Sequence, residues 1–456
     1  MQEQTQNPLG SLPVKVMLRR LAIPAVVANV VNGLYNIVDQ IFIGQGVGFL
    51  GNAATNIAFP LTTLGLAVGL MLGIGGASKF NLELGAGRKD MARKTVGTVA
   101  SALILVGVVV GILVRLFLEP LMIGFGATDS LLSLAMTYTS ITTLGLPFWL
   151  FAIGANALVR ADGAAKYSMM AVIAGALVNT VLDPLFIFSF GWGMAGAAWA
   201  TVLGQLVSFV ILAAYFRRFQ SVQFEWADFR IDWGLLKSVC SLGMASFIFQ
   251  SSNLLVQVVA NNSLRVYGGA SVYGSEVAIA IAGIVMKVNV MMVALVIGVV
   301  QGSQPLCSFN YGAGQYERVR ETIRRSLRVV LTIGIVFWLL VELFPKQILQ
   351  GFGSGSDLYF QFGVLYMRLF FLVVLLNGVQ TFSSTFFPAI GKAQIGARIS
   401  MLKQLVLLIP LLLLLPLFLG VTGLALAFPI ADGLSFVVAS YLLYREYQAL
   451  GQMGTS

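Results

Sequence analysis

Histidine is absent from the 456 residues of this chain, and cysteine occurs only at Cys240 and Cys307. Without histidine the chain lacks the commonest general base, the Ser–His nucleophile pairing and the imidazole metal ligand. The two cysteines lie in apolar stretches, where they are interpreted as small core residues and indicate nothing about disulfides. These absences disfavour most hydrolytic enzymes and histidine-ligated metal sites.

Charged residues are also scarce, at 10% of the chain against 58% hydrophobic residues. A soluble domain carries about 25% charged residues. Apolar runs long enough to cross a bilayer recur from end to end, and a backbone in hydrocarbon must form helices or a closed barrel. The runs are long and continuously apolar, whereas barrel strands are short and alternating. The sequence therefore predicts an all-α membrane protein.

The apolar runs predict twelve transmembrane helices. The first run is too long for the apolar region of a signal peptide, so it is expected to be an uncleaved first span. The predicted spans are residues 16–44, 54–83, 95–117, 131–158, 166–190, 194–216, 238–265, 276–308, 320–343, 357–388, 396–418 and 421–444.

Most lysines and arginines fall in the connections that follow the even-numbered spans or near the two ends of the chain, with Lys346 the clear exception. The positive-inside rule then places both termini in the cytoplasm of a multi-pass protein of the bacterial inner (plasma) membrane. This distribution also explains the net charge of +10 by attraction to the lipid bilayer, so no nucleic-acid partner is expected. The connecting residues are Arg88, Lys89, Arg93, Lys94, Arg160, Lys166, Arg217, Arg218, Arg230, Lys237, Arg318, Arg320, Arg324, Arg325, Arg328, Lys392, Arg398 and Lys403.

Three loop motifs recur at nearly the same distance along the chain. Residues 84–90 (LGAGRKD) match residues 311–317 (YGAGQYE), residues 193–196 match 420–423, and residues 163–166 match 391–394. Because six spans are an even number, the repeat predicts two six-helix lobes in the same orientation, at residues 1–218 and 237–456, joined by a cytoplasmic linker at 219–236. Parallel repeats of this kind are typical of transporters that hold substrate between the halves, although duplication also builds channels and inert scaffolds.

Polar side chains in the predicted spans of the first half follow helical spacing. Ionisable groups in hydrocarbon are costly and are functional candidates by default. Two carboxylates with neutral oxygen ligands could share a proton, coordinate a hard cation such as Na⁺ (at Asp39, Asn179 and Asp183), or only hydrogen-bond helices together. One stripe comprises Asn29, Asn32, Asn36 and Asp39, and we expect a cation-coupling cluster of Asp39, Asn156, Asn179, Asp183 and Thr201.

The second half keeps a polar stripe without an acid, and its buried charge is predicted to be basic, at Lys287 and Arg368. The lysine could equally snorkel or pair helices. Flexible methionines suit an adaptable drug-binding surface, although they are also ordinary packing residues. The side chains that we expect to contact substrate are Asn32, Tyr35, Asn36, Gln250, Asn253, Gln257, Met286, Lys287 and Met291.

Several motifs, in order and over nearly the whole chain, resemble those of the multidrug and toxic compound extrusion (MATE) family, in particular its bacterial DNA-damage-inducible F-like branch. They are Pro24 with Asp39, residues 84–87 (LGAG), residues 156–163 (NALVRADG), residues 179–184 (NTVLDP) and residues 308–314 (SFNYGAG).

The resemblance implies a V-shaped pair of six-helix lobes that opens alternately to each side of the membrane. It also implies export of cationic amphiphiles in exchange for H⁺ or Na⁺, with a cation site at Asp39, Asn156, Asn179, Asp183 and Thr201. Some members carry acids for Na⁺ in the seventh and tenth spans. Here those stretches offer Gln250, Asn253, Gln257 and Gln380, so no second Na⁺ site is expected.

The favoured function is therefore a multidrug efflux antiporter that acts on small organic cations, as a monomer and without a cofactor. The alternatives are a flippase for lipid-linked glycans, which would need a cavity rich in arginine and lysine, and a membrane-embedded enzyme. Such an enzyme usually shows a histidine signature or a large catalytic loop, and this chain has no histidine.

Overall fold

The computed structural model describes residues 7–352 and 356–453, and within these ranges the secondary structure is entirely helical. The short helices are α1 (Pro8–Ser11), α5 (Leu118–Gly124), α12 (Pro345–Phe352), and the 3₁₀ turns η3 (Phe216–Arg218) and η4 (Trp226–Phe229). The long helices are α2 (Val14–Gly46), α3 (Phe49–Gly85), α4 (Lys89–Leu116), α6 (Asp129–Ala161), α7 (Ala165–Pro184), α8 (Gly193–Tyr215), α9 (Trp233–Gly269), α10 (Ser275–Gly312), α11 (Tyr316–Leu343) and α17 (Val421–Met453).

Two further spans are interrupted. The tenth consists of α13 (Asp357–Phe370) and α14 (Val374–Ala389), which meet at an angle of 42°. The eleventh consists of α15 (Ala393–Met401), the π-helix η5 (Leu402–Leu408) and α16 (Ile409–Leu419). Counting the bent pair as one span, the described residues contain 12 helices long and apolar enough to cross a membrane. The predicted twelve-span, all-α membrane fold is confirmed.

Glycines with positive φ angles lie at equivalent helix boundaries in the two halves. Gly87 and Gly314 have φ angles of 78° and 70°, and Gly193 and Gly420 have 53° and 58°. Only glycine adopts this region without a steric penalty. These pairs coincide with the loop motifs from which the sequence predicts a repeat.

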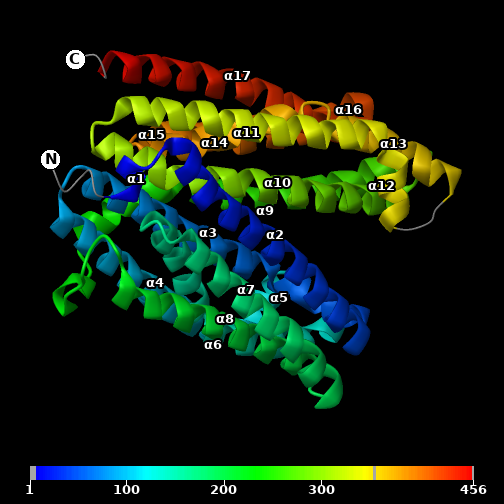
Figure 1. Ribbon diagram of the computed structural model, residues 1–456. Helices are drawn as coiled ribbons and strands as arrows, with labels where there is room; N and C mark the ends of the chain where they lie inside the picture. Colours follow the sequence, from blue (N-terminus) through cyan, green and yellow to red (C-terminus); the bar gives the residue numbers. More distant parts are fainter. Residues whose placement is uncertain (1–6, 353–355, 454–456) are drawn as a thin grey trace.

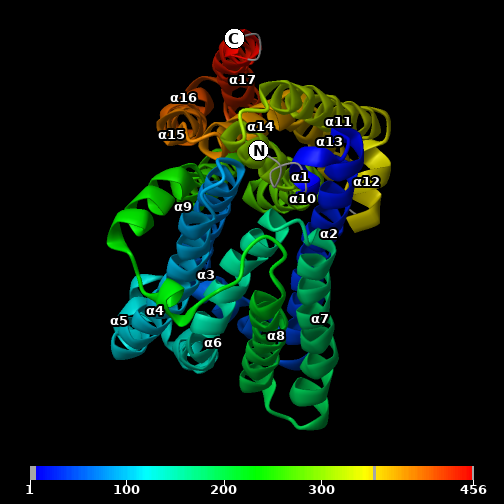
Figure 2. The ribbon, with the colours of Figure 1, turned by 60° about the vertical axis from the view of Figure 1, so that its left-hand side comes forward.

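The helices of the two halves lie close together at one end and diverge toward the other. Figure 1 shows both termini at the same end of the molecule, which we call the terminal side, and α2 and α10 separating from each other toward the opposite side. Figure 2 shows α6, α7 and α8 grouped away from α11, α14 and α17, with α2, α3, α9 and α10 between the two groups.

Small residues bring the halves together near the terminal side. A Cβ atom added to Gly302 of α10 would lie 2.5 Å from the Cα of Ala22 on α2, and a Cβ at Gly243 of α9 would overlap the carbonyl oxygen of Met71 on α3. Glycine and alanine allow this approach because backbones can touch where no side chain intervenes. Contact between the halves therefore depends on a few positions that tolerate no larger residue.

Hydrogen bonds also connect the two halves on the terminal side. Arg318 of α11 donates through Nη2 to the carbonyl oxygens of Leu9 (3.0 Å) and Leu12 (2.7 Å), and Asn310 of α10 donates to that of Leu9 (3.1 Å). The short segment before α2 is thereby attached to the second half of the chain. Gln304 adds bonds from α10 to α3.

The connection between α8 and α9 runs along the terminal side. Buried Asp162, in the turn after α6, accepts hydrogen bonds from the Tyr215 hydroxyl (2.8 Å) and from the backbone N–H groups of Gln220 (2.8 Å) and Ser221 (3.0 Å). Burial raises the pKa of the Asp162 carboxyl, and these hydrogen bonds oppose the shift. Asp162 thus holds the start of the connection, and α4 holds its later part, where Arg93 pairs with Glu225 (2.9 Å) and Asp228 (3.0 Å) and Ser101 donates to the Phe229 carbonyl oxygen (2.7 Å).

Candidate functional site: an acidic cluster in the first half

Two carboxylates from different helices meet inside the first half of the chain. Asp39 of α2 is 8% exposed and Asp183 of α7 is 0% exposed, and their carboxyl groups adjoin each other. Asp183 is the penultimate residue of α7, which ends at Pro184 and continues as the π-helix η2 (Leu185–Ser189). Proline removes a backbone donor, and π-helical turns occur frequently at functional sites.

Two neutral residues complete the cluster as the sequence predicts. Asn179 lies one turn before Asp183, and its amide lies 3.2 Å from Asp183 Oδ2 and 3.3 Å from the Thr201 backbone nitrogen of α8. In that orientation the Asn179 amide donates to the carboxylate and accepts from the Thr201 N–H. Four of the five predicted side chains therefore come together from α2, α7 and α8.

Asn156 is the exception, because the structure does not bring its side chain to the carboxylates. Its side chain lies near the terminal end of α6, where its amide oxygen accepts from Arg160 and its amide nitrogen donates to the Ser168 carbonyl oxygen at 3.3 Å. Sequence order placed Asn156 in the right lobe, but the rotation of α6 directs it toward the buried guanidinium of Arg160.

Two tyrosines flank the carboxylates. Tyr35, one turn before Asp39 on α2, interacts electrostatically with both acids, so it belongs to this cluster as well as being a predicted substrate contact. Tyr138 of α6 also interacts with both acids and lies within hydrogen-bonding reach of Thr201. Sequence reasoning missed Tyr138, although a polar hydroxyl within a predicted span was a visible signal.

The cluster has a surplus of oxygen and no basic partner. Within residues 7–352 and 356–453, neither Asp39 nor Asp183 forms an ion pair, and the buried Oδ1 atom of Asp39 has no hydrogen-bond partner. Two adjoining carboxylates repel each other when both are ionised. A bound proton or a monovalent cation would relieve this repulsion, and the oxygen ligands of Asp39, Asn179 and Asp183 suit either one.

Part of the polar stripe of the second half joins two helices. Asn253 donates to Gln250 at 3.2 Å and accepts from Gln404 of η5 at 3.1 Å, so these side chains join α9 to the eleventh span. Gln257, two turns from Gln250 on the same helix, is exposed.

The prediction that Lys287 is a buried charge is wrong. Lys287 on α10 is exposed, as are Met286 (39%) and Met291 (38%), whereas Met292 is buried. Asn32 and Asn36 on α2 are likewise exposed. These side chains remain candidates for contact with substrate because they lie on helices that diverge away from the terminal side (Figure 1).

The second half also contains an acid that sequence reasoning missed. Asp432 of α17 forms an ion pair with Lys403 of η5 at 2.8 Å and accepts from Asn377 of α14 at 3.1 Å. The two charged side chains are 13% and 8% exposed. Lys403 therefore lies inside the helix bundle rather than in a connecting loop, and the prediction that buried charge in this half is only basic was wrong. The signal was present, because Asp432 interrupts an otherwise apolar run.

Arg368, the other residue predicted to be a buried basic charge, forms an ion pair at the surface. Arg368 of α13 lies 3.2 Å from Glu342 of α11, and both side chains have substantial exposure. It is therefore not a buried charge.

A family model decides between the interpretations of this architecture. The model described as MatE matches residues 24–185 and 251–414, which include most of both halves and all of the acidic cluster except Thr201. The chain belongs to the MatE family. This membership makes the chain a transporter and sets aside the membrane-embedded enzyme.

Individual relatives of this MatE-family chain agree with that assignment. It is 34% identical to the chain in a structure described as that of the MATE multidrug transporter DinF-BH, with a TM-score of 0.87 and coverage of 95% of this chain and 96% of that one. The multidrug export protein MepA of Staphylococcus aureus (strain MSSA476) is 24% identical over 442 residues, which cover 95% of this chain and 94% of MepA.

A third similarity concerns the fold alone. A structure described as the outward-facing conformation of a multidrug resistance MATE family transporter has a TM-score of 0.89 at 22% identity, covering 99% of this chain and 98% of that one. The MatE-family chain thus shares its helical arrangement with transporters to which its sequence similarity is low.

Proposed function

We propose that this MatE-family transporter exports cationic and amphiphilic organic compounds in exchange for H⁺ or Na⁺. The observation that carries the proposal is the pair of adjoining carboxylates, Asp39 and Asp183, which lack a basic partner in the part of the chain that the structure describes. Multidrug export is the activity stated for MepA and DinF-BH, and their similarity supports the same activity here.

The proposed location is the bacterial inner membrane, with both termini in the cytoplasm and the transporter acting as a monomer. The support is the concentration of lysine and arginine in the connections on the terminal side, which the positive-inside rule assigns to the cytoplasm. The halves then meet on the cytoplasmic side and diverge toward the outside, where ions enter.

In this conformation the coupling ion reaches Asp39 and Asp183 from outside and removes the repulsion between them. The α2 helix is the element that responds, because it carries Asp39 and contains Pro24 and Gly33 within an unbroken run from Val14 to Gly46. Proline lacks the N–H that would complete the helical ladder, so bending there breaks no additional hydrogen bond.

Export requires only that ion and substrate bind the two orientations differently. An organic cation competes with H⁺ or Na⁺ for the negative charge of the cluster, and rocking of the halves exposes each of them to the opposite face. Exposed Asn32, Asn36 and Gln257 supply neutral hydrogen-bonding groups, and Met286 and Met291 supply flexible apolar surface.

A flippase for lipid-linked glycans is less well supported. Such a protein would need uncompensated basic side chains for phosphate between its halves. Of Lys287, Arg368 and Lys403, Arg368 is neutralised by Glu342 and Lys403 by Asp432, so only Lys287 among these three is exposed and without an ion pair in the described residues. One lysine is a weak basis for recognising a diphosphate.

The test is ethidium efflux from cells that express Asp39→Asn or Asp183→Asn. Each variant keeps the size of the side chain but cannot exchange a proton or neutralise a cation, so efflux should fall to the level of cells without the transporter. Asp129→Asn is the matched control, because that carboxylate is exposed at the start of α6. Equal amounts of protein in the membrane would separate lost transport from lost folding, and retained efflux in either cluster variant would refute the assignment.

The coupling ion is identified with the purified protein in proteoliposomes. A pH gradient and a Na⁺ gradient are imposed separately, and ethidium movement is followed by fluorescence. Movement that requires one gradient identifies the ion, whereas movement that responds to neither, with active protein present, would refute antiport.

A further inference from the structure

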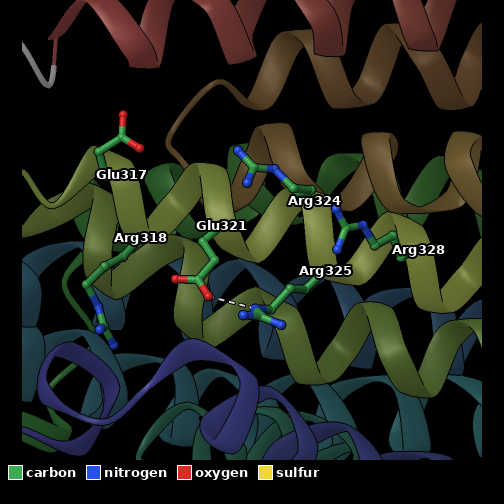
Figure 3. Close-up of a pocket in the computed structure, with 6 residues that line it drawn as sticks. All are labelled: Glu317, Arg318, Glu321, Arg324, Arg325 and Arg328. Carbon is green, nitrogen blue, oxygen red and sulfur yellow. Dashed lines mark hydrogen bonds and ion pairs between the residues drawn. The ribbon is translucent and has the colours of Figure 1, made fainter.

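Five arginines lie between residues 318 and 328, in the first turns of α11 on the terminal side. These arginines belong neither to the acidic cluster nor to the candidate substrate contacts described for α2, α9 and α10. An open cavity of about 290 Å³ lies beside this stretch, and Figure 3 shows its lining. The lining residues are Glu317, Arg318, Glu321, Arg324, Arg325 and Arg328.

Three of the arginines have partners: two form ion pairs with glutamates, and one donates hydrogen bonds to backbone carbonyl oxygens. Arg320 lies 2.6 Å from Glu317 and Arg325 lies 2.7 Å from Glu321. Arg318 donates to backbone carbonyl oxygens of the segment before α2, as described above.

Arg324 and Arg328 are different, because no carboxylate in the described parts of the chain lies within ion-pair distance of either. Arg324 donates to the Tyr447 hydroxyl of α17 at 2.7 Å, a neutral partner that does not balance its charge. Both side chains are exposed. They are four residues apart, so they lie on one face of α11, and Figure 3 shows them side by side on the helix.

Their depth matches the boundary between polar and apolar parts of the helix. Arg328 lies twelve residues after the start of α11, which is about 18 Å along the axis. Residues 329–341 contain no charged side chain. Several of them are exposed apolar groups, among them Val329 (41%), Val336 (52%) and Leu340 (49%).

We propose that Arg324 and Arg328 bind the phosphate group of an anionic phospholipid, whose acyl chains lie along the exposed apolar residues of α11. Guanidinium groups bind phosphate oxygens through paired hydrogen bonds, and basic pockets at the cytoplasmic membrane surface bind anionic headgroups. The adjacent apolar surface favours a lipid over a soluble phosphate, because only a lipid would cover both the cavity and the side of the helix.

The test measures binding of phosphatidylglycerol to the full-length protein by native mass spectrometry, with phosphatidylcholine of the same acyl chains as the reference. The wild type should prefer phosphatidylglycerol, and R324Q/R328Q should bind it roughly 30-fold more weakly. The control R217Q/R218Q removes the same charge from two exposed arginines on the same side of the molecule and should leave binding unchanged.

R324K/R328K provides a second test that preserves net charge. It should weaken binding because lysine lacks the planar fork of arginine, and it keeps the proposal testable if the glutamine variant does not fold. Equal losses in R324Q/R328Q and R217Q/R218Q would overturn the site in favour of general charge attraction. Binding of inorganic phosphate as strong as that of the lipid would overturn the lipid as its occupant.

Discussion

The buried ion pair between Lys403 and Asp432 yields the sharpest prediction about stability. The pair joins η5 to α17 at 2.8 Å, with both side chains almost removed from solvent, and Asn377 holds the second carboxylate oxygen. Lys403→Met would leave the carboxylate buried with one amide donor, and Asp432→Asn would leave the ammonium without a counter-charge. The double variant removes both charges while keeping similar side-chain volumes.

The expected magnitudes differ sharply between the single variants and the double one. Breaking a buried pair from one side costs about 3–5 kcal/mol, whereas replacing both members is often nearly neutral. The free energy of unfolding of each single variant should therefore be about 3 kcal/mol or more below that of the wild type. The double variant should recover most of this difference. For a six-helix unit each kcal/mol shifts the melting temperature by roughly 2–4 °C, so the single variants should melt roughly 6–12 °C lower.

The assay is the apparent melting temperature of the purified protein in detergent, at one fixed heating rate because such unfolding is often irreversible. Glu342→Gln is the control, since it breaks the exposed pair with Arg368. Exposed pairs contribute about 0–1 kcal/mol, so this variant should melt close to the wild type.

The reasoning fails if Lys403→Met or Asp432→Asn melts like the wild type, because the charges would then be hydrated rather than buried. It also fails if the melting temperature of the double variant falls by as much as the two single decreases added together. The destabilisation would then come from lost packing rather than from an unpaired charge. A double variant that is stable but does not transport would show that the pair serves function instead of stability.

Three further predictions concern the terminal side. Gly243→Leu should force α3 and α9 apart, because even a Cβ atom at this position overlaps the Met71 carbonyl oxygen. Labelling of nearby Cys240 by a membrane-impermeant thiol reagent in inverted vesicles should then increase. Unchanged labelling would contradict the close packing. Arg318→Gln removes donors to the backbone of residues 9–12, so amide hydrogen exchange there should accelerate, and equal rates would show that the bonds are dispensable. Asp162→Ala removes the carboxylate that holds Gln220 and Ser221 at the start of the α8–α9 connection, so protease cleavage near these two residues should increase while the spans stay resistant. An unchanged digestion pattern would argue against this anchor.

The number and order of the spans could be read from the sequence. An apolar run of about 20 residues has few alternatives to a transmembrane helix, and the structure places helices at all of the predicted ranges. The break between α13 and α14 was not predicted, because the residues around it are as apolar as those of an unbroken span. Likewise, the sequence does not reveal that the eleventh span contains a π-helix.

The acidic cluster was predicted in part. Helical spacing placed Asn179 and Asp183 on one face; Asp183 adjoins Asp39, and the Asn179 amide lies 3.2 Å from Asp183 Oδ2. The same reasoning failed for Asn156, whose side chain points to Arg160, and for Lys287, which is exposed.

What the sequence determined by itself is therefore the class of molecule: a helical bundle that spans a membrane, with its basic residues gathered on one side and acids set into its first half. These properties depend on local composition, because the transfer of each segment into hydrocarbon depends mainly on its own residues. The tertiary structure alone decided which faces of the helices meet, and so paired Lys403 with Asp432, turned Asn156 away from the carboxylates and brought Tyr138 to them. Lipid and protein interior are similarly apolar, so the hydrophobic pattern of a span does not determine its rotation, and only packing against the other helices does.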